Sequence, residues 1–369
     1  MGRRELLIIV GFFAVGSLLY WWTAPPATES SRFSLGRLVD EIRADIRRDS
    51  SDTTFTHAGT IALSGSVAEV RLSGVTGDVL VTGEDRADIA FELLVHSTGP
   101  DEATAVEYAK STALVEDDLG GTLGLRVSYP PEGRQRTEIV MRVPSRLGLR
   151  VETQSSSNTS VISDLRAVRL EGTVGETTLE RIAGEVSGSH RNGRLTVTGA
   201  GSVSLTLQQS RATFADVTGG LALNATRGET RIVGSGGAIE IEQANNELRI
   251  EEHDGAIRVS GSGGQVEIVG PRREVEVDVR RAEVEVVLAR AVGVTVITTD
   301  EPLRLVLEGQ PAITLDAVIA GSGEIDAGDV GLTATRGQDQ TSLTHAFADP
   351  APTRVVLRNR RDDIVIRKR

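Results

Sequence analysis

The chain has 369 residues, a formal net charge of −12 at pH 7 and no cysteine. The negative charge argues against a nucleic-acid partner, because phosphates are neutralised by Lys and Arg. Without cysteine the chain has no disulfide, no thiol nucleophile and no zinc–thiolate site. Glycine accounts for 40 residues and aromatic residues for only 3%, so we expect a core of thin, repeated layers filled by small aliphatic side chains.

The N-terminal segment predicts a transmembrane signal anchor over residues 1–23. Residues Leu6–Trp22 carry no charge, and as a helix they would extend about 25 Å, close to the thickness of a bilayer core. Arg3 and Arg4 precede this stretch, so the positive-inside rule places the N-terminus in the cytoplasm. We therefore expect one pass through the inner, cytoplasmic membrane, with the bulk of the chain periplasmic or extracellular. A cleaved signal peptide and a buried soluble helix are the alternatives.

Residues 24–56 are expected to form a linker and an amphipathic helix. Pro25 and Pro26 open a polar stretch, which is typical of a linker. Five apolar residues then recur at helical spacing between Leu35 and Ile46, with charged residues between them. This juxtamembrane helix could lie on the membrane surface, pair with a partner helix or cap the β structure that follows.

Residues 57–148 predict an N-terminal β region with one inserted helix. Alternating apolar and polar residues, as at 68–72 and 89–93, are typical of half-buried strands joined by tight turns. The helix is expected over residues 101–118, because two acids follow Pro100 at its start and two glycines follow its end. It could cover the N-terminal end of the β structure.

Residues 149–369 predict a β-solenoid, and with it an all-β fold class for the chain. Short strands that end in Ser or Thr and then Gly, such as 195–199, 215–219 and 257–261, recur roughly every 8–12 residues without a strict period. A β-sandwich has the same spacing, but the strands are too many and too short for one sandwich. The glycine runs at 234–237 and 261–264 are expected to be corner turns, because no helix follows them as it would a phosphate loop.

Three motifs resemble the widespread bacterial "putative adhesin" domain family of unknown function. The first is IVMRVP at 139–144, followed by LGLRVET at 147–153, and the second is the run of strand–Ser/Thr–Gly units after them. The third is the C-terminal pair of strands at 355–366, in which Arg360–Asp363 replaces the family's usual glycine turn. The resemblance extends over about residues 65–366. It implies a β-solenoid like the heads of autotransporters, and the family name implies adhesion or surface display.

The sequence gives no catalytic, cofactor-binding or metal site. No two of the five histidines (His57, His96, His190, His253 and His345) lie at the spacing of a metal-binding helix. Two acidic clusters are either calcium ligands or solvated turn acids. One consists of Glu251, Glu252, His253 and Asp254, and the other of Glu324, Asp326 and Asp329.

The last strands are rich in basic residues: Arg354, Arg358, Arg360, Arg361, Arg367, Lys368 and Arg369. They form either a patch for acidic lipid or another polyanion, or charges that protect a terminal edge strand from aggregation.

Together these patterns predict a membrane-anchored, non-enzymatic surface module without a cofactor. Its partner would be an envelope protein or a surface ligand. One alternative is a regulatory partner that acts through another membrane protein, and another is a polysaccharide-active β-helix enzyme, which needs paired carboxylates in a cleft.

Overall fold

The computed structural model describes residues 51–153, 158–349, 351 and 353–369. The predicted anchor at 1–23 and the predicted juxtamembrane helix at 35–48 lie outside them. Residues Asp52–Arg369 form one compact unit, and within the described residues we find no helix of the length and apolarity needed to cross a bilayer. The domain boundaries stay predictions; strand β1 (Ser51–Ala62) runs through the one expected between residues 56 and 57.

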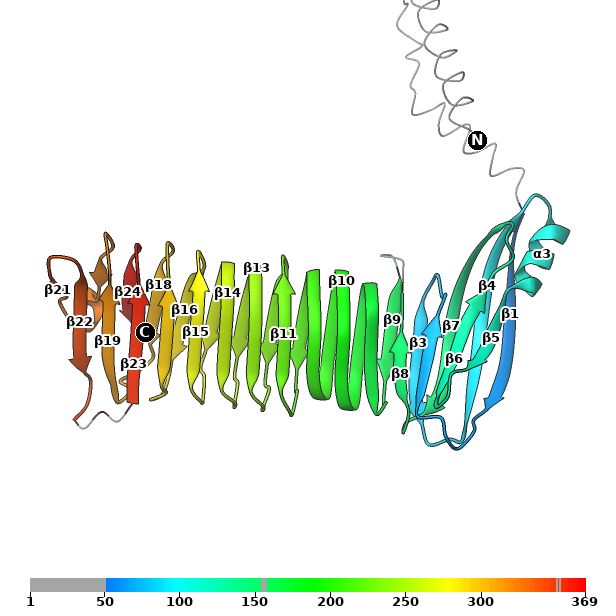
Figure 1. The fold of residues 1–369 in the computed structure, drawn as a ribbon, viewed down its shortest axis with the longest axis horizontal. Helices are drawn as coiled ribbons and strands as arrows, with labels where there is room; N and C mark the ends of the chain where they lie inside the picture. The colour runs from blue at the N-terminus through cyan, green and yellow to red at the C-terminus, as the bar shows by residue number, and fades with distance from the viewer. Residues whose placement is uncertain (1–50, 154–157, 350, 352) are drawn as a thin grey trace, which may run out of the picture. The chain divides into compact units, whose positions relative to one another are not determined.

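The unit is all-β apart from one α-helix and one 3-10 helix in its described part, so the predicted fold class is confirmed at this level (Figure 1). Its N-terminal region holds β2 (Glu69–Ser73), β3 (Val79–Glu84), β4 (Asp88–Gly99), α3 (Glu102–Ser111), β5 (Ala113–Asp118), β6 (Thr122–Ser128) and β7 (Arg134–Pro144). The middle holds β8 (Gly148–Val151), β9 (Thr159–Ser163), β10 (Ala167–Ala215), β11 (Leu221–Thr226), β12 (Glu229–Val233), β13 (Ile239–Glu251), β14 (Ile257–Val269), β15 (Val275–Arg280), β16 (Glu283–Leu288), β17 (Val294–Thr298) and β18 (Leu303–Leu307). The C-terminal region holds β19 (Ile313–Ile319), β20 (Ile325–Asp326), η1 (Gly328–Val330), β21 (Thr335–Arg336), β22 (Thr341–Ala346), β23 (Thr353–Asn359) and β24 (Ile364–Lys368).

The middle region is a stack of coils whose strands pair in parallel with a step of 18 residues. Leu221 on β11 pairs with Ile239 on β13, and Glu229 on β12 accepts a hydrogen bond from Arg211, 18 residues earlier. Each coil contributes one strand to face A, such as β11, and one to face B, such as β12. The sequence was expected to have no strict period, and that expectation is wrong from β11 to β15, where every pairing keeps the same step.

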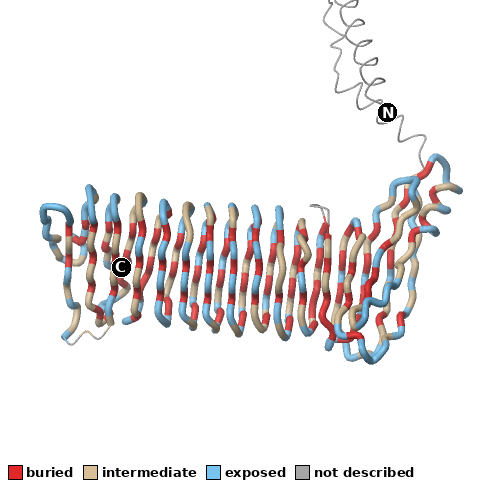
Figure 2. Tube along the Cα trace, viewed as in Figure 1, coloured by how far each residue is buried: buried red, intermediate tan, exposed pale blue. Residues whose placement is uncertain are grey.

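The core consists of aliphatic rows that run through successive coils. On face A, Leu221, Ile239, Ile257 and Val275 lie in one row. On face B, Ile232, Ile250, Ile268 and Val286 form another. All eight are at most 2% exposed, and each such side chain contributes roughly 1.5–3 kcal/mol through burial. Figure 2 shows the buried residues alternating with exposed ones along each strand.

Each regular coil bends at two corners through a residue with a left-handed backbone. The corner after face A is occupied by Gln209, Arg227, Asn245, Gly263 and Arg281, all with φ between 50° and 70°. The corner after face B is occupied by Asp216, Gly234, Glu252 and Gly270. The glycine runs at 234–237 and 261–264 are therefore corners, as predicted. The strand expected at 215–219 is wrong, because Asp216 turns the chain and ends β10 at Ala215.

The inserted helix is shorter than predicted. Helix α3 begins after Asp101, whose side chain accepts a hydrogen bond from the Thr104 amide, and ends at Ser111. The remainder of the predicted helix, residues 113–118, is strand β5, which pairs antiparallel with β6. Tertiary pairing with β6 thus overrides the local helical pattern. Ala105 and Ala109 are buried, and α3 packs against β4 at the N-terminal end of the stack (Figure 1).

The C-terminal strands are not at the end of the stack. Strand β23 pairs in parallel with β17 on one side and with β19 on the other. Strand β24 likewise lies between β18 and β20. The last coil in sequence is therefore inserted beneath an earlier one, as the red strands between yellow and orange show in Figure 1. The prediction that these strands form a terminal edge is wrong, because each has a neighbour on both sides.

Antiparallel strands close the stack at both ends. Strand β4 covers β7 and β5 covers β6 at the N-terminal end, while β22 covers β19 at the C-terminal end. Val330, Leu332 and Ala334, around η1, also pack against the core. Closing strands of this kind keep the parallel ladders from continuing into a second molecule.

One buried histidine interrupts the aliphatic filling. His190 is fully buried, and burial lowers the pKa of its imidazole from 6.5 to about 4. His253 is also buried, and its pKa is lowered for the same reason. Both side chains are therefore neutral inside the stack at neutral pH.

The corner conformation predicts opposite effects for two substitutions of Arg227. Arg227→Gly should stabilise the fold by about 0.5 kcal/mol, because the left-handed cost disappears while the unfolded chain gains some freedom. Arg227→Val should destabilise it by roughly 1–2 kcal/mol, because a β-branched residue tolerates this region least. Urea unfolding measures both. Ala222→Val, on extended backbone, is the control, and a loss of stability as large as that of Arg227→Val would contradict the assignment.

The inserted coil predicts a local effect of truncation. Removing residues 353–369 takes away the strands on which β19 and β20 rest, so the segment 309–346 should detach while the coils before it persist. Limited proteolysis should then cut within 309–346 and spare β11–β16. Removing only Lys368 and Arg369 is the control. Continued protection of β19 in the long truncation would show that β23 does not lie beneath it.

Burial of His190 predicts that acid weakens the fold above the range in which carboxylates titrate. The unfolded chain binds a proton at this residue near pH 6.5, whereas the folded chain does so only near pH 4. Its contribution is therefore complete above pH 6.5 and falls by about 3 kcal/mol as the pH is lowered to 4. His190→Gln should flatten the curve of unfolding free energy against pH over this window, with the His253 share remaining. An unchanged slope would contradict the buried, neutral state.

Candidate interaction surface

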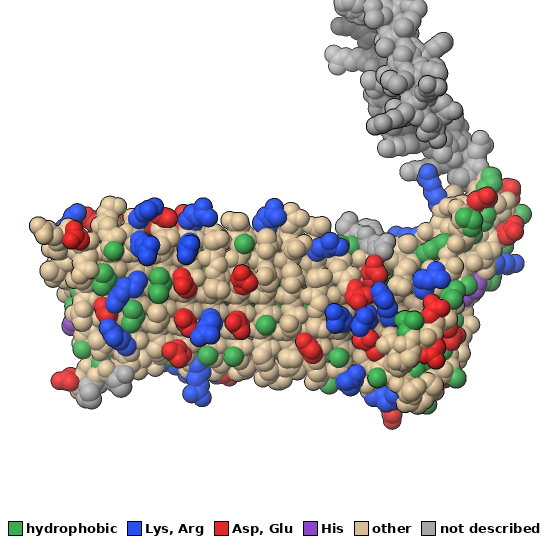
Figure 3. Space-filling view, viewed as in Figure 1, with side chains coloured by type: hydrophobic (Ala, Val, Ile, Leu, Met, Phe, Trp, Pro, Cys, Tyr) green, Lys and Arg blue, Asp and Glu red, His purple; other side chains and the backbone are tan. Residues whose placement is uncertain are grey.

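The outer surface of the coils is laid out in charged rows that pair from one coil to the next. Arg258 binds Glu276 at 2.8 Å and Arg211 binds Glu229 at 2.7 Å, each across a step of 18 residues. Arg304 binds Glu285 at 2.8 Å in the same way. Figure 3 shows Lys and Arg interspersed with Asp and Glu over the visible face, without a large patch of one sign. Such exposed pairs add little stability individually, but they leave few charges uncompensated along these rows.

Face A departs from this pattern over a shallow hollow with a volume of about 560 Å³. The hollow extends from Arg169 to Ser260, across strands β10, β11, β13 and β14. Its outward-facing lining residues are Arg169, Ser187, Gly188, Ser204, Thr206, Ala222, Asn224, Glu240, Glu242 and Ser260. Five coil steps of about 4.8 Å separate the two ends, so the hollow is roughly 24 Å long.

The hollow exists because the outward residues of three successive coils are short. Ser187, Ser204 and Ala222 occupy positions where the flanking coils carry long side chains such as Arg169, Glu240 and Arg258. Thr206 and Asn224 form the parallel row two residues further along their strands. The floor is the backbone of face A, with Leu205 and Leu223 buried beneath it. The rigid ladder therefore presents a lane of hydroxyl and amide groups.

The ends of this lane carry opposite charges. Arg169 stands at one end, and Glu240 and Glu242 stand at the other. Glu242 accepts a hydrogen bond from the Asn224 amide at 3.4 Å. Arg169 and Glu240 belong to no ion pair within the part of the chain that the structure describes. An extended polar chain with a cationic group near the glutamates and an anionic group near Arg169 would fit this arrangement.

The first predicted acidic cluster does not converge on one point. Glu251 binds Arg231 at 2.6 Å and Arg249 at 2.8 Å, and Arg249 is the main cause that lowers the pKa of this carboxyl. His253 is buried, whereas Asp254 binds Arg272 at 2.6 Å on the outside. Glu252 is the exposed corner residue between them. The corner thus sends successive side chains in different directions, and the carboxylates pair with arginines of neighbouring coils.

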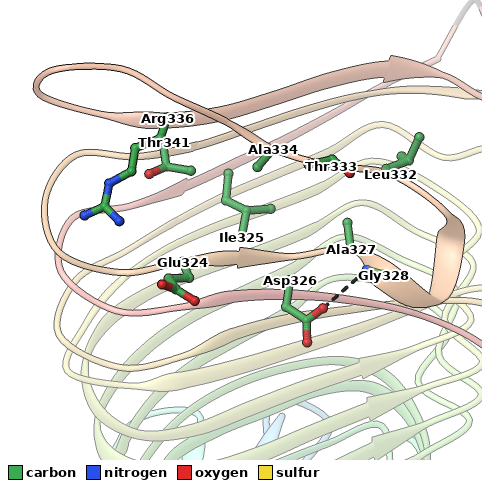
Figure 4. Close-up of a pocket in the computed structure, with 10 residues that line it drawn as sticks. All are labelled: Glu324, Ile325, Asp326, Ala327, Gly328, Leu332, Thr333, Ala334, Arg336 and Thr341. Carbon is green, nitrogen blue, oxygen red and sulfur yellow. Dashed lines mark hydrogen bonds between the residues drawn. The ribbon is translucent and has the colours of Figure 1, made fainter.

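The second predicted cluster lies at the C-terminal end, beside a pocket of about 280 Å³ (Figure 4). Asp326 binds Arg367 at 2.7 Å and accepts a hydrogen bond from the Gly328 amide. Asp329 lies 3.5 Å from the same arginine. Arg367 lowers the pKa of Asp326. Within the described ranges, no group of three or more metal-ligating side chains is found.

The basic residues of the C-terminus mostly pair with acids on neighbouring coils. Asp316 receives both Arg354 and Arg358, which together hold its pKa below the usual range. Arg361 binds Asp300 at 3.0 Å, and Arg369 lies 3.7 Å from Glu308. These arginines hold the inserted coil in place, so neither the polyanion patch nor the edge protection describes them.

The residues of the hollow were not singled out in the sequence. Ser204, Ala222 and Asn224 are ordinary surface residues in any local window, and the glutamates stand inside a regular strand pattern. Writing the sequence in rows of 18 would have placed Ser204, Ala222 and Glu240 in one column. That alignment is the signal that could have found the lane, and it requires knowing the period.

No family model matches the chain, and no curated protein matches it. Three solved structures are similar to it. A "putative cell adhesion protein" from Clostridium sporogenes has 7% identity and a TM-score of 0.22, covering 86% of this chain and 100% of its own. A "putative adhesin" from Parabacteroides distasonis has 11% identity and a TM-score of 0.36, covering 68% and 97%. One from Bacteroides fragilis has 11% and 0.23, covering 86% and 98%. The names of these neighbours agree with the family that the sequence motifs resemble.

Proposed function

We propose that this chain is an adhesin-like surface module of the bacterial envelope, and that it binds an extended polar ligand in the hollow on face A without catalysing a reaction. The observation that carries the proposal is the lane of Ser187, Ser204, Thr206 and Asn224 between Arg169 and the two glutamates. The names of the similar structures agree with a role in adhesion.

The architecture supports the same proposal. In this proposal the coil stack is a β-solenoid, which holds outward side chains at a fixed spacing of about 4.8 Å along its axis. Such a surface suits a ligand that is itself extended, because each repeat of the ligand meets an equivalent row of hydrogen-bonding groups. The uncharged segment Leu6–Trp22 would anchor the module in the inner membrane, with the stack outside the cytoplasm.

The chemistry of the hollow favours binding over catalysis. Glu240 and Glu242 are both exposed side chains on one strand, whereas a general acid usually needs burial to raise its pKa. The lining residues include no aromatic ring on which a sugar could stack. The polysaccharide-active alternative therefore has two exposed carboxylates in its favour and little else. A purified chain that cleaves a polysaccharide, and loses this activity in Glu240→Gln, would revive it.

Site-specific photocrosslinking in living cells tests where the ligand binds. A crosslinking residue at Thr206, in the hollow, should capture an envelope component, while one at Thr213 on face B should not. Ala222→Arg fills the lane with a long, solvent-compatible side chain and should reduce capture at Thr206 by about tenfold, equivalent to roughly 1.4 kcal/mol. Thr213→Arg on face B is the matched control.

Two outcomes would contradict the proposal. Equal capture from Thr206 and Thr213 would mean that face A is not selective, and capture that survives Ala222→Arg would mean that the lane is not the site. Capture only from a crosslinker in the 35–48 segment would instead support the regulatory alternative, in which the chain acts through another membrane protein.

A further inference from the structure

The interior of the first coils contains a concentration of polar atoms that lack a protein partner. Asn158 Nδ2 and Oδ1, Ser160 Oγ, Thr177 Oγ1 and His190 Nε2 are buried without a hydrogen bond to any protein atom. All four residues are at most 2% exposed. Leaving a single such group unpaired costs roughly 1–3 kcal/mol, so a fold that leaves several of them unpaired needs another source of hydrogen bonds.

The strand register brings these atoms to one region. Ser160 on β9 pairs directly with Thr177 on β10, so the two hydroxyls belong to adjacent coils and point inward together. Asn158 precedes Ser160 by two residues and faces the same interior, and its carbonyl accepts from the Glu176 amide. The imidazole of His190 lies close to the backbone of Gly175, the residue before Glu176. The cluster therefore occupies consecutive coils at the corner after face A.

The hydrogen bonds around His190 fix the role of its free nitrogen. The Ser210 hydroxyl donates its proton to a backbone carbonyl, that of Gln208 at 3.0 Å or that of His190 itself at 3.4 Å. The His190 Nδ1, 3.0 Å from Ser210 Oγ, must then be the donor to this oxygen. A neutral imidazole carries only one N–H, so Nε2 is an acceptor. It needs a donor that no described protein group supplies.

We propose that one or more ordered water molecules occupy this interior site, donating to His190 Nε2 and bridging it to Asn158 and to the hydroxyls of Ser160 and Thr177. Water fits because it supplies both donors and acceptors, and buried waters typically make about three hydrogen bonds to otherwise unpaired groups. A metal ion fits poorly, because the four side chains bring no carboxylate or thiolate to offset a buried charge.

The site explains why polar side chains occupy these inward positions. Along the same inward column the later coils carry Leu195, Ala212 and Leu248, which need no such partner. A hydrated interior would therefore be a local feature of the coils around residues 158–190, held by specific hydrogen bonds where the rest of the core is held by aliphatic packing.

Isosteric substitution in the full-length chain gives a test whose sign decides. If water bonds the Thr177 hydroxyl, Thr177→Val breaks a hydrogen bond and should lower the midpoint of urea unfolding. If the hydroxyl is dry and unpaired, the same change removes a penalty and should raise it. Thr230→Val is the matched control, because Thr230 lies in the same inward column and accepts a direct bond from Asn246 at 3.2 Å.

The expected result is a downward shift for Thr177→Val of the same order as that for Thr230→Val, with Ser160→Ala shifting in the same direction. Unchanged or raised midpoints for both variants would overturn the proposal. Should a variant fail to fold, a high-resolution crystal structure of the unmodified chain decides instead. Density for a water within hydrogen-bonding distance of His190 Nε2 and one other cluster atom would support the site, and direct contacts among the four side chains without water would overturn it.

Discussion

The whole unit depends on one constraint, the parallel backbone hydrogen bonding of each coil to the next at a fixed step of 18 residues. Because the step holds each side chain over its counterpart, inward aliphatic residues become continuous rows and outward residues become continuous columns. The same constraint explains the corners: the chain must turn at the same place in every coil, and it does so through a left-handed residue even where Arg, Gln or Glu stands instead of glycine. It also explains the ends, where antiparallel strands cover the parallel ladders.

Surface chemistry follows from the same register. Charges that lie one coil apart are neighbours, so an arginine and a glutamate 18 residues apart in the sequence form an ion pair, as Arg258 and Glu276 do. A change in the size or charge of one column over a few coils is enough to make a feature, since the backbone beneath does not move. The hollow on face A arises in this way, from three short side chains in a column whose flanking members are long. A ligand for such a feature would be recognised through rows of hydrogen bonds between two charged ends.

Much of the fold could be predicted from local sequence. The alternation of apolar and polar residues located most strands, and the glycine runs located corners, because both depend on neighbours in the chain. The period escaped notice because corners without glycine, such as Arg227 and Gln209, carry no local turn signal. Helix α3 was predicted too long because residues 113–118 satisfy a helical pattern until β6 is there to pair with them. The inserted position of β23 and β24 depends on pairings with strands about 60 residues away, and the hollow depends on the period, so neither was accessible from local patterns.

Crosslinking of engineered cysteines measures the register most directly, and the chain has no native cysteine to interfere. Val356 on β23 pairs with Thr295 on β17 and with Asp316 on β19, so a cysteine at 356 should form a disulfide with a cysteine at either position. Cysteines at 295 and 316 should not, because they lie two strands apart, about 9.6 Å, beyond the span of a disulfide. Efficient bonding between 295 and 316, with none to 356, would show that the coils follow one another in sequence order and would contradict the account.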